Sequence, residues 1–175
     1  MLETSPARSG DTTVSYGGKY IHSKYDPYRE AERFAAARSF VGVSLCILIE
    51  PGLDYLSRAI GNTAPDVRCI SIHCSDDLRG RTHGNAEEEF FPSGGNTLRA
   101  FLGRHIDDAE LPDTMILEWE PSASAFGESY SVILNEVYGY FRERNASMHT
   151  TGIFGRRWIK QRVISFLELE EAGVP

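Results

Sequence analysis

Cysteine is scarce in this sequence, and no stretch is apolar enough for a membrane span or a secretion signal. The cysteines, Cys46, Cys69 and Cys74, are too few and too irregularly spaced for a disulfide framework or a zinc site. The amino-terminal residues hold no apolar run of the kind that a signal peptide needs. The longest apolar run, residues 43–49, is too short to cross a bilayer. These absences predict a cytoplasmic protein in a reducing compartment.

The chain also has no excess of positive charge. The chain has 18 basic and 25 acidic residues, which gives a formal net charge of −7 at pH 7. Such a chain lacks the basic surface of a general nucleic-acid binder or of a protein that docks on anionic membranes. Its 175 residues are 41% hydrophobic and 25% charged, values typical of a globular domain with its own core. General disorder is therefore excluded.

Two continuous apolar runs indicate the fold class. Residues 43–50 and 67–74 have the length and composition of strands that are covered on both faces, and residues 53–61 between them have helical spacing. A strand, a helix and a strand in so short a stretch form a βαβ unit, which requires parallel strands. Residues 114–121 predict a third core strand that stops at a proline. The sequence thus predicts an α/β fold with a Rossmann-like parallel sheet and flanking helices.

The amino-terminal region carries turn and helix-cap signals. Two short β-like runs flank Gly17 and Gly18, which predicts an N-terminal β-hairpin. Asp26 followed by Pro27 predicts the start of a helix, with Asp26 as its N-cap. Residues 1–13 are mostly polar and small, so we expect a disordered tail ahead of a single α/β domain over residues 14–175.

The turn after the first parallel strand is where a sheet of this type normally binds its ligand. Here that turn reads EPGLDY, and carboxylates at Glu50 and Asp54 would repel a phosphate. A cationic cofactor such as S-adenosylmethionine would be repelled less, and two aspartates after the second strand could hold its ribose. The simpler interpretation is a structural turn in a chain without a cofactor. The candidate cofactor-binding residues are Gly52, Asp54, Asp76 and Asp77.

No catalytic residue and no metal site is predicted. His22 and Ser23 are neighbours in an extended segment, so their side chains point to opposite faces and cannot pair as base and nucleophile. The other histidines show no metal-ligand spacing. Residues 156–162, RRWIKQR, form a basic patch. Because the chain as a whole is acidic, a solvated helix face or a contact with an acidic protein surface is a better interpretation than nucleic-acid binding. The candidate interaction residues are Arg156, Arg157, Trp158 and Lys160.

The segment YIHSKYDPYREAERF is more particular than helix capping requires. It resembles the LHSrYdPxrEAeR-type segment of the motility accessory factor family of bacterial glycosyltransferases, which includes hydroxymethylpterin-diphosphokinase-like relatives. Further similarities follow in order at Gly52, Leu53 and Tyr55, at Trp119 and Pro121, and at Thr151, Phe154, Gly155 and Trp158. The motif residues of unknown role are His22, Ser23, Tyr25, Asp26, Pro27 and Glu30.

The resemblance implies a role in flagellin glycosylation. Members of the family transfer nonulosonic sugars from CMP-activated donors, with a transferase domain that begins at a GPSL-type motif. No GPSL occurs in this chain, whose similarity runs from residue 20 to about residue 167. The resemblance therefore implies a non-catalytic amino-terminal domain, from a truncated or split gene, that contacts a transferase domain or flagellin. The alternatives are an eroded remnant, or a small transferase that uses S-adenosylmethionine or a nucleotide sugar in the βαβ crevice.

Overall fold

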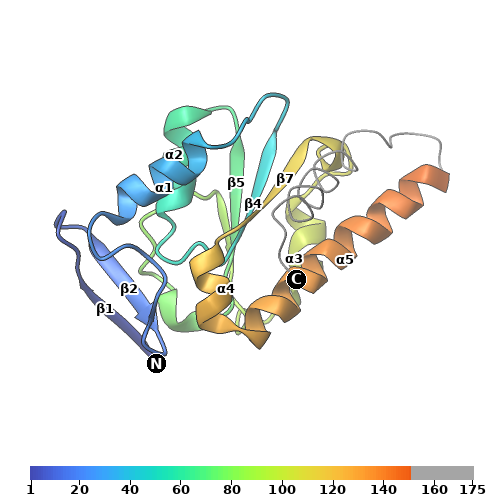
Figure 1. The fold of residues 1–175 in the computed structure, drawn as a ribbon. Coiled ribbons are helices and arrows are strands. Elements are labelled where there is room, and N and C mark those ends of the chain that lie inside the picture. Colours follow the sequence, from blue (N-terminus) through green and yellow to red (C-terminus); the bar gives the residue numbers. More distant parts are fainter. Residues whose placement is uncertain (151–175) are drawn as a thin grey trace, which may run out of the picture.

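The computed structural model describes residues 1–150, which form two β-sheets surrounded by helices (Figure 1). An amino-terminal sheet has the strand order β1-β2-β3, and the main sheet has the order β6-β5-β4-β7. The strands are β1 Leu2–Pro6, β2 Thr12–Tyr16, β3 Lys19–Tyr20, β4 Leu45–Ile49, β5 Arg68–Ile72, β6 Glu88–Phe90 and β7 Thr114–Glu118. The α-helices are α1 Pro27–Ala36, α2 Tyr55–Thr63, α3 Leu98–His105, α4 Glu120–Phe126 and α5 Glu128–Thr150.

The main sheet confirms the predicted α/β fold. All of its strands are parallel, and Leu45 at the start of β4 lies between Arg68 of β5 and Thr114 of β7. Every residue of β4 is fully buried, as its unbroken apolar sequence requires. Helices α1 and α2 cover one side of the sheet, whereas α3 and α5 cover the other (Figure 1). The predicted βαβ unit is therefore β4, α2 and β5.

The amino-terminal sheet confirms one prediction and corrects another. Strands β2 and β3 form the expected hairpin, with positive φ at Gly17 and Gly18 in its turn. The prediction of a disordered tail over residues 1–13 is wrong. Strand β1 pairs antiparallel with β2 along its whole length, from Leu2 opposite Tyr16 to Pro6 opposite Thr12. Most side chains of β1 are exposed, so a search for apolar periodicity misses this strand.

Helix starts follow the local sequence signals. Asp26 caps α1 as predicted, because its Oδ1 accepts a hydrogen bond of 2.9 Å from the Arg29 N–H. Thr97 caps α3 in the same way through the Ala100 N–H. The third strand ends at Glu118, three residues before the predicted stop at Pro121, and Pro121 lies instead in the first turn of α4, a short helix that was not predicted.

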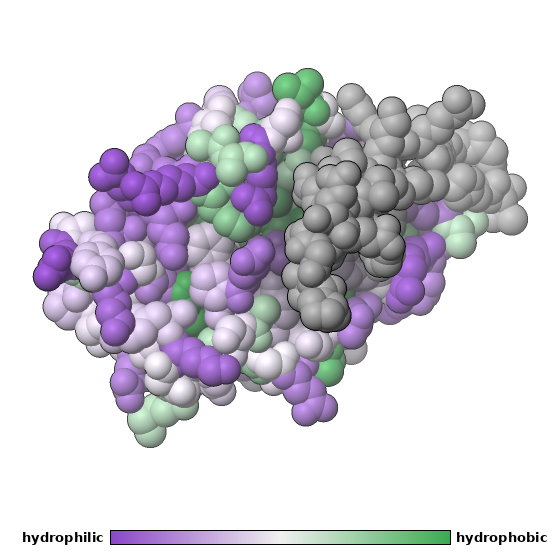
Figure 2. Space-filling model, viewed as in Figure 1, coloured by the Kyte–Doolittle hydropathy of each residue, from purple (hydrophilic) through white to green (hydrophobic). Residues whose placement is uncertain are grey.

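The predicted carboxy-terminal helix lies outside the described residues. This applies to the candidate interaction residues and to the family positions after residue 150, which stay predictions: Thr151, Phe154, Gly155, Arg156, Arg157, Trp158 and Lys160. Among residues 1–150, no helix combines the length and the apolar character that a membrane span requires. On the face that Figure 2 shows, hydrophobic residues are scattered among hydrophilic ones.

Candidate functional site

The turn between β4 and α2, residues 50–54, lies at the carboxyl ends of the parallel strands, where α/β sheets bind ligands. All five of its residues are buried. Its backbone is unusual, because φ is positive at Glu50 (44°), Gly52 (64°) and Asp54 (62°). Positive φ is costly for residues other than glycine, so the side chains of Glu50 and Asp54 must be held firmly by their surroundings.

Asp54 is held by the helix that it starts. Its carboxylate accepts hydrogen bonds from the Ser57 N–H at 3.3 Å and from the Ser57 hydroxyl at 2.9 Å, so it is the N-cap of α2. Burial raises the pKa of Asp54 to about 6, although the hydrogen bonds from Ser57 act in the opposite direction. The chain at Gly84 covers the carboxylate so closely that a Cβ there would lie 2.2 Å from Asp54 Oδ2. Asp54 therefore serves the fold.

Gly52 lies directly beneath the imidazole of His22. A Cβ at Gly52 would lie 2.4 Å from His22 Nε2 and 2.7 Å from Ile21 Cγ2. His22 Nε2 accepts a hydrogen bond of 2.9 Å from the Leu53 N–H, so the ring is neutral and carries its proton on Nδ1. Burial, with a smaller effect from His83, lowers the pKa of His22 to about 3. His22 thus fills the space over the glycine that a ligand would need.

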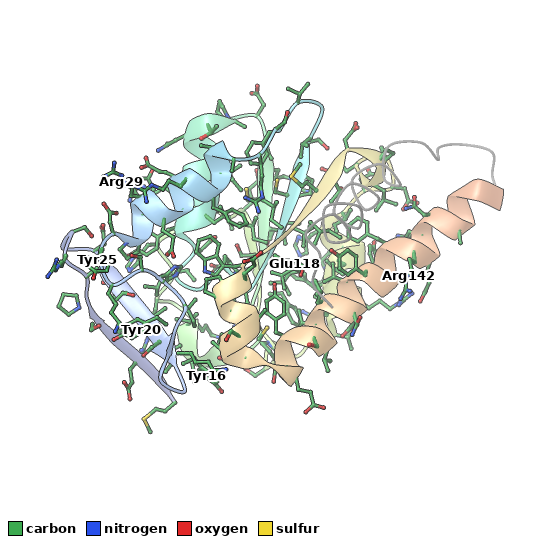
Figure 3. The ribbon with its side chains drawn as sticks, viewed as in Figure 1. Tyr16, Tyr20, Tyr25, Arg29, Glu118 and Arg142 are labelled. Atoms are coloured by element: carbon green, nitrogen blue, oxygen red, sulfur yellow. The ribbon has the colours of Figure 1, made fainter. Side chains whose placement is uncertain are left out.

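Ser23 and Glu30 lie next to His22 and are bonded to each other. Ser23 donates its N–H to Glu30 Oε2 at 2.8 Å, and the same oxygen lies 4.0 Å from His22 Nδ1. The Ser23 hydroxyl accepts the N–H groups of Tyr25 and Asp26, which leads the chain into α1. Tyr25 itself points outward beside the amino-terminal sheet and is 64% exposed (Figure 3). His22, Ser23 and Glu30 therefore have a structural role at the β4–α2 turn, whereas Asp26 and Pro27 have theirs at the start of α1.

Trp119, at the end of the third strand, contributes to the same packing. Its indole N–H donates a hydrogen bond of 2.8 Å to the Ile21 carbonyl, and its ring centroid lies 5.8 Å from that of His22. On the same side of the turn, the Ser122 hydroxyl of α4 donates to the Glu50 carbonyl at 2.7 Å. The end of β7 thus braces both His22 and the turn that His22 covers.

A second buried group links the ends of β4, β5 and β6. Glu50 and His73 are fully buried, and Glu50 Oε1 lies 3.4 Å from His73 Nδ1 while Oε2 accepts the Cys74 N–H. On its other side, His73 Nε2 lies 3.7 Å from Glu89 Oε1. The imidazole stacks on Phe91 with ring centroids 4.4 Å apart and planes 5° apart. We call Glu50, His73 and Glu89 the strand-end network.

Electrostatics keeps the strand-end network charged. Burial alone would lower the pKa of His73. The hydrogen bond with Glu50, the interaction with Glu89 and the nearby charges of Glu50 and Asp54 outweigh burial and raise this pKa to about 9. In return, His73 lowers the pKa of Glu89. Burial and the charge of Glu50 raise the pKa of the Cys74 thiol, so this thiol is not an activated nucleophile. The network can hold strands together but presents no reactive group.

The four candidate cofactor-binding residues fall into a buried pair and a surface pair. Gly52 and Asp54 lie beneath the chain as described, whereas Asp76 and Asp77 belong to a short 3-10 turn, Asp76–Leu78. Asp76 is engaged by the Arg79 guanidinium and by the Ser93 N–H, and Asp77 is exposed. Their use by a cofactor stays a prediction. Within residues 1–150, no cluster of His, Cys, Asp or Glu side chains is arranged to hold a metal ion.

The strand-end network was not predicted from the sequence. Its only signals are a histidine at the end of an apolar strand and the acidic run Glu87–Glu89, neither of which indicates a pair. No family profile, curated protein or solved structure matches the chain.

Proposed function

We propose that this chain is a non-catalytic α/β domain that acts through protein contacts, as the resemblance to the amino-terminal domain of motility accessory factor glycosyltransferases implies. The observation that carries the proposal is the filled β4–α2 turn, in which His22 covers Gly52 and Glu50 is bound to His73. A ligand at this turn would have to displace a buried imidazole or separate a buried ion pair, and either change is costly. A domain that acts through its surface has no need of that space.

The motif behind the resemblance supports the same conclusion. His22, Ser23 and Glu30 are bonded to the turn or to one another, and Trp119 supports them from the end of β7. These side chains therefore maintain a shape and do not present groups to a substrate. The partner class that follows from the resemblance is a flagellin-modifying transferase domain or flagellin. The proposal assigns the domain to the cytoplasm, in keeping with unpaired thiols at Cys46, Cys69 and Cys74.

The test is association with a catalytic fragment of a flagellin-modifying glycosyltransferase that lacks its own amino-terminal domain. We expect a one-to-one complex with a dissociation constant of about 10 µM or tighter in sedimentation velocity at low salt. Basic residues steer association with an acidic partner, so raising the salt concentration should weaken the complex. Replacing Arg156, Arg157 and Lys160 together with glutamate should weaken the complex at least tenfold.

A matched variant controls for net charge. It carries glutamate at Arg29, Arg33 and Arg81, three exposed arginines elsewhere in the chain, and it should bind the fragment as the unmodified protein does. If this protein and the transferase fragment sediment in their mixture at about 100 µM as each does alone, the transferase domain is rejected as the partner. Equal weakening by the two triple variants would reject residues 156–160 as the contact.

A further inference from the structure

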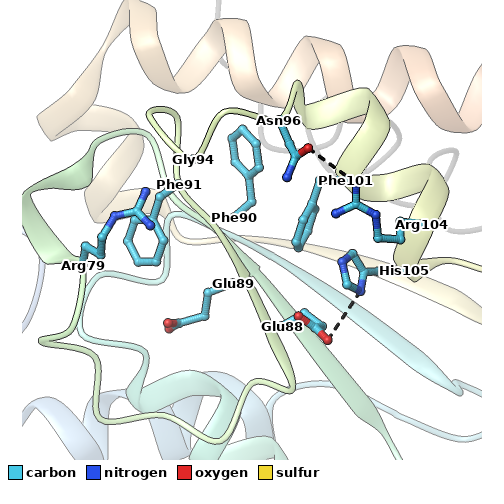
Figure 4. A pocket seen from close by; sticks show the side chains of 10 residues that line it. All are labelled: Arg79, Glu88, Glu89, Phe90, Phe91, Gly94, Asn96, Phe101, Arg104 and His105. Atoms are coloured by element: carbon cyan, nitrogen blue, oxygen red, sulfur yellow. Dashed lines mark hydrogen bonds and ion pairs between the residues drawn. The ribbon is translucent and has the colours of Figure 1, made fainter.

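An open cavity of about 340 Å³ lies beside the edge strand β6, apart from the filled β4–α2 turn. Its walls come from β6, from the loop that follows and from α3 (Figure 4). The loop lies at the carboxyl end of a parallel strand, the end at which sheets of this class bind ligands. The volume is at the lower end of the range for small-molecule pockets. The cavity therefore has room for one small compound.

Among the described residues that line the cavity, one cation, Arg104, lacks a carboxylate partner. Arg79 is paired with Asp76 at 2.6 Å, and His105 lies 3.5 Å from Glu88. Glu89, the remaining acid in the lining, faces His73. Arg104 has no carboxylate partner among residues 1–150, and its guanidinium makes only a long hydrogen bond of 3.4 Å to Asn96 Oδ1. Since a guanidinium has five N–H donors arranged for a carboxylate, Arg104 can take an anion from solution.

Three largely buried phenylalanines, Phe90, Phe91 and Phe101, belong to the lining, each with 6% of its surface exposed. The rings of Phe90 and Phe101 have centroids 5.5 Å apart, next to Arg104 and Asn96 (Figure 4). Phe91 is fixed by the parallel ring of His73 and by the Arg79 guanidinium, which lies 4.6 Å from the Phe91 centroid. These contacts keep the rings in place before any ligand arrives, which reduces the entropic cost of binding. A flat apolar group fits such walls better than a flexible chain.

We propose that this cavity binds a small organic acid that carries a flat ring, with its carboxylate on Arg104 and its ring against Phe90 and Phe101. The site goes beyond the proposed accessory function and does not depend on it, because it shares no residue with the β4–α2 turn. Glu89 is turned to the buried His73, and Glu88 Oε1 lies 3.5 Å from His105 Nδ1.

The test is a two-dimensional amide NMR titration with benzoate. Benzylamine, a cation of similar shape, and inorganic phosphate, an anion without a ring, serve as comparison probes. Benzoate should shift the amides of residues 88–105 saturably, with a dissociation constant of about 1 mM or tighter. Phosphate should bind at least tenfold more weakly, and benzylamine should leave these amides unchanged.

Two variants of α3 test the role of Arg104. Arg104→Gln should weaken benzoate binding about tenfold, whereas Arg99→Gln should leave it unchanged, because Arg99 pairs with Glu143 and does not line the cavity. The amide spectra of both variants without ligand establish that they are folded. Benzoate binding that is absent at about 10 mM, or equal in wild type and Arg104→Gln, would overturn the proposal. Phosphate binding as tight as that of benzoate would overturn the ring requirement and with it the ligand class.

Discussion

Replacing Gly52 with alanine is expected to lower the free energy of unfolding by about 3–5 kcal/mol. The backbone at this position has φ of 64°, which an alanine adopts only with strain. The new Cβ would also lie 2.4 Å from His22 Nε2 and 2.7 Å from Ile21 Cγ2, two side chains that are almost completely buried. His22 cannot retreat without losing its hydrogen bond from the Leu53 N–H.

Urea unfolding measures this effect, and Gly80→Ala is the matched control. Gly80 also has positive φ (71°), but a Cβ there meets no atom within 4 Å, so only the backbone strain of about 1 kcal/mol remains. Combining Gly52→Ala with His22→Ala should cost less than the two single changes together, because removing the imidazole removes the closer of the two clashes. A Gly52→Ala variant no less stable than Gly80→Ala would mean that His22 does not fill the turn.

The strand-end network is expected to make the protein lose about 3 kcal/mol of stability between pH 6.5 and pH 9. The pKa of His73 is raised in the folded state to about 9 from its ordinary value of 6.5. A histidine of this kind stabilises the folded protein fully below pH 6.5, where it is charged in both states. Its contribution falls as the pH rises towards 9, because the unfolded chain then gives up the proton that the folded protein retains.

Glu50→Gln tests this interpretation. Glutamine keeps an acceptor for the Cys74 N–H but removes the charge nearest to His73. The free energy of unfolding at pH 6.5 should therefore fall by about 3 kcal/mol, and most of the loss of stability between pH 6.5 and pH 9 should disappear. Urea unfolding at pH values between 6 and 9 provides the comparison. Glu110→Gln is the control, because Glu110 pairs with Arg68 and should leave the alkaline slope unchanged. An unchanged slope in Glu50→Gln would contradict the charged network.

Much of the fold could be predicted because its signals are local. The apolar runs predict β4 and β5, the turn at Gly17 and Gly18 predicts the hairpin, and Asp26 predicts the start of α1. Strand β1 could not be predicted in this way, because it is fixed by backbone pairing with β2 while its side chains face solvent. Edge pairing of this kind leaves little trace in the hydrophobic pattern.

Less of the candidate site than of the fold could be predicted from the sequence. The turn at residues 50–54 could be placed at the strand ends, and its acidic character argued against phosphate. The groups that fill it could not be identified, because His22 reaches it from the segment between β3 and α1, and His73 is distinguished only by its long-range partners. A histidine near a carboxylate has no characteristic spacing when the two lie on different strands. The structural role of the motif therefore emerges only from the folded chain.

The filled turn is tested most directly by calorimetric titration with S-adenosylmethionine, CMP and a CMP-linked sugar. The titrations use Arg104→Gln, so that the cavity beside β6 does not contribute to the heat. With His22 over Gly52 and with Glu50 and Asp54 buried in the turn, the account predicts no binding tighter than about 1 mM for any of the three compounds. Micromolar binding of S-adenosylmethionine that is lost in Gly52→Ala would contradict it and identify the turn as a cofactor site.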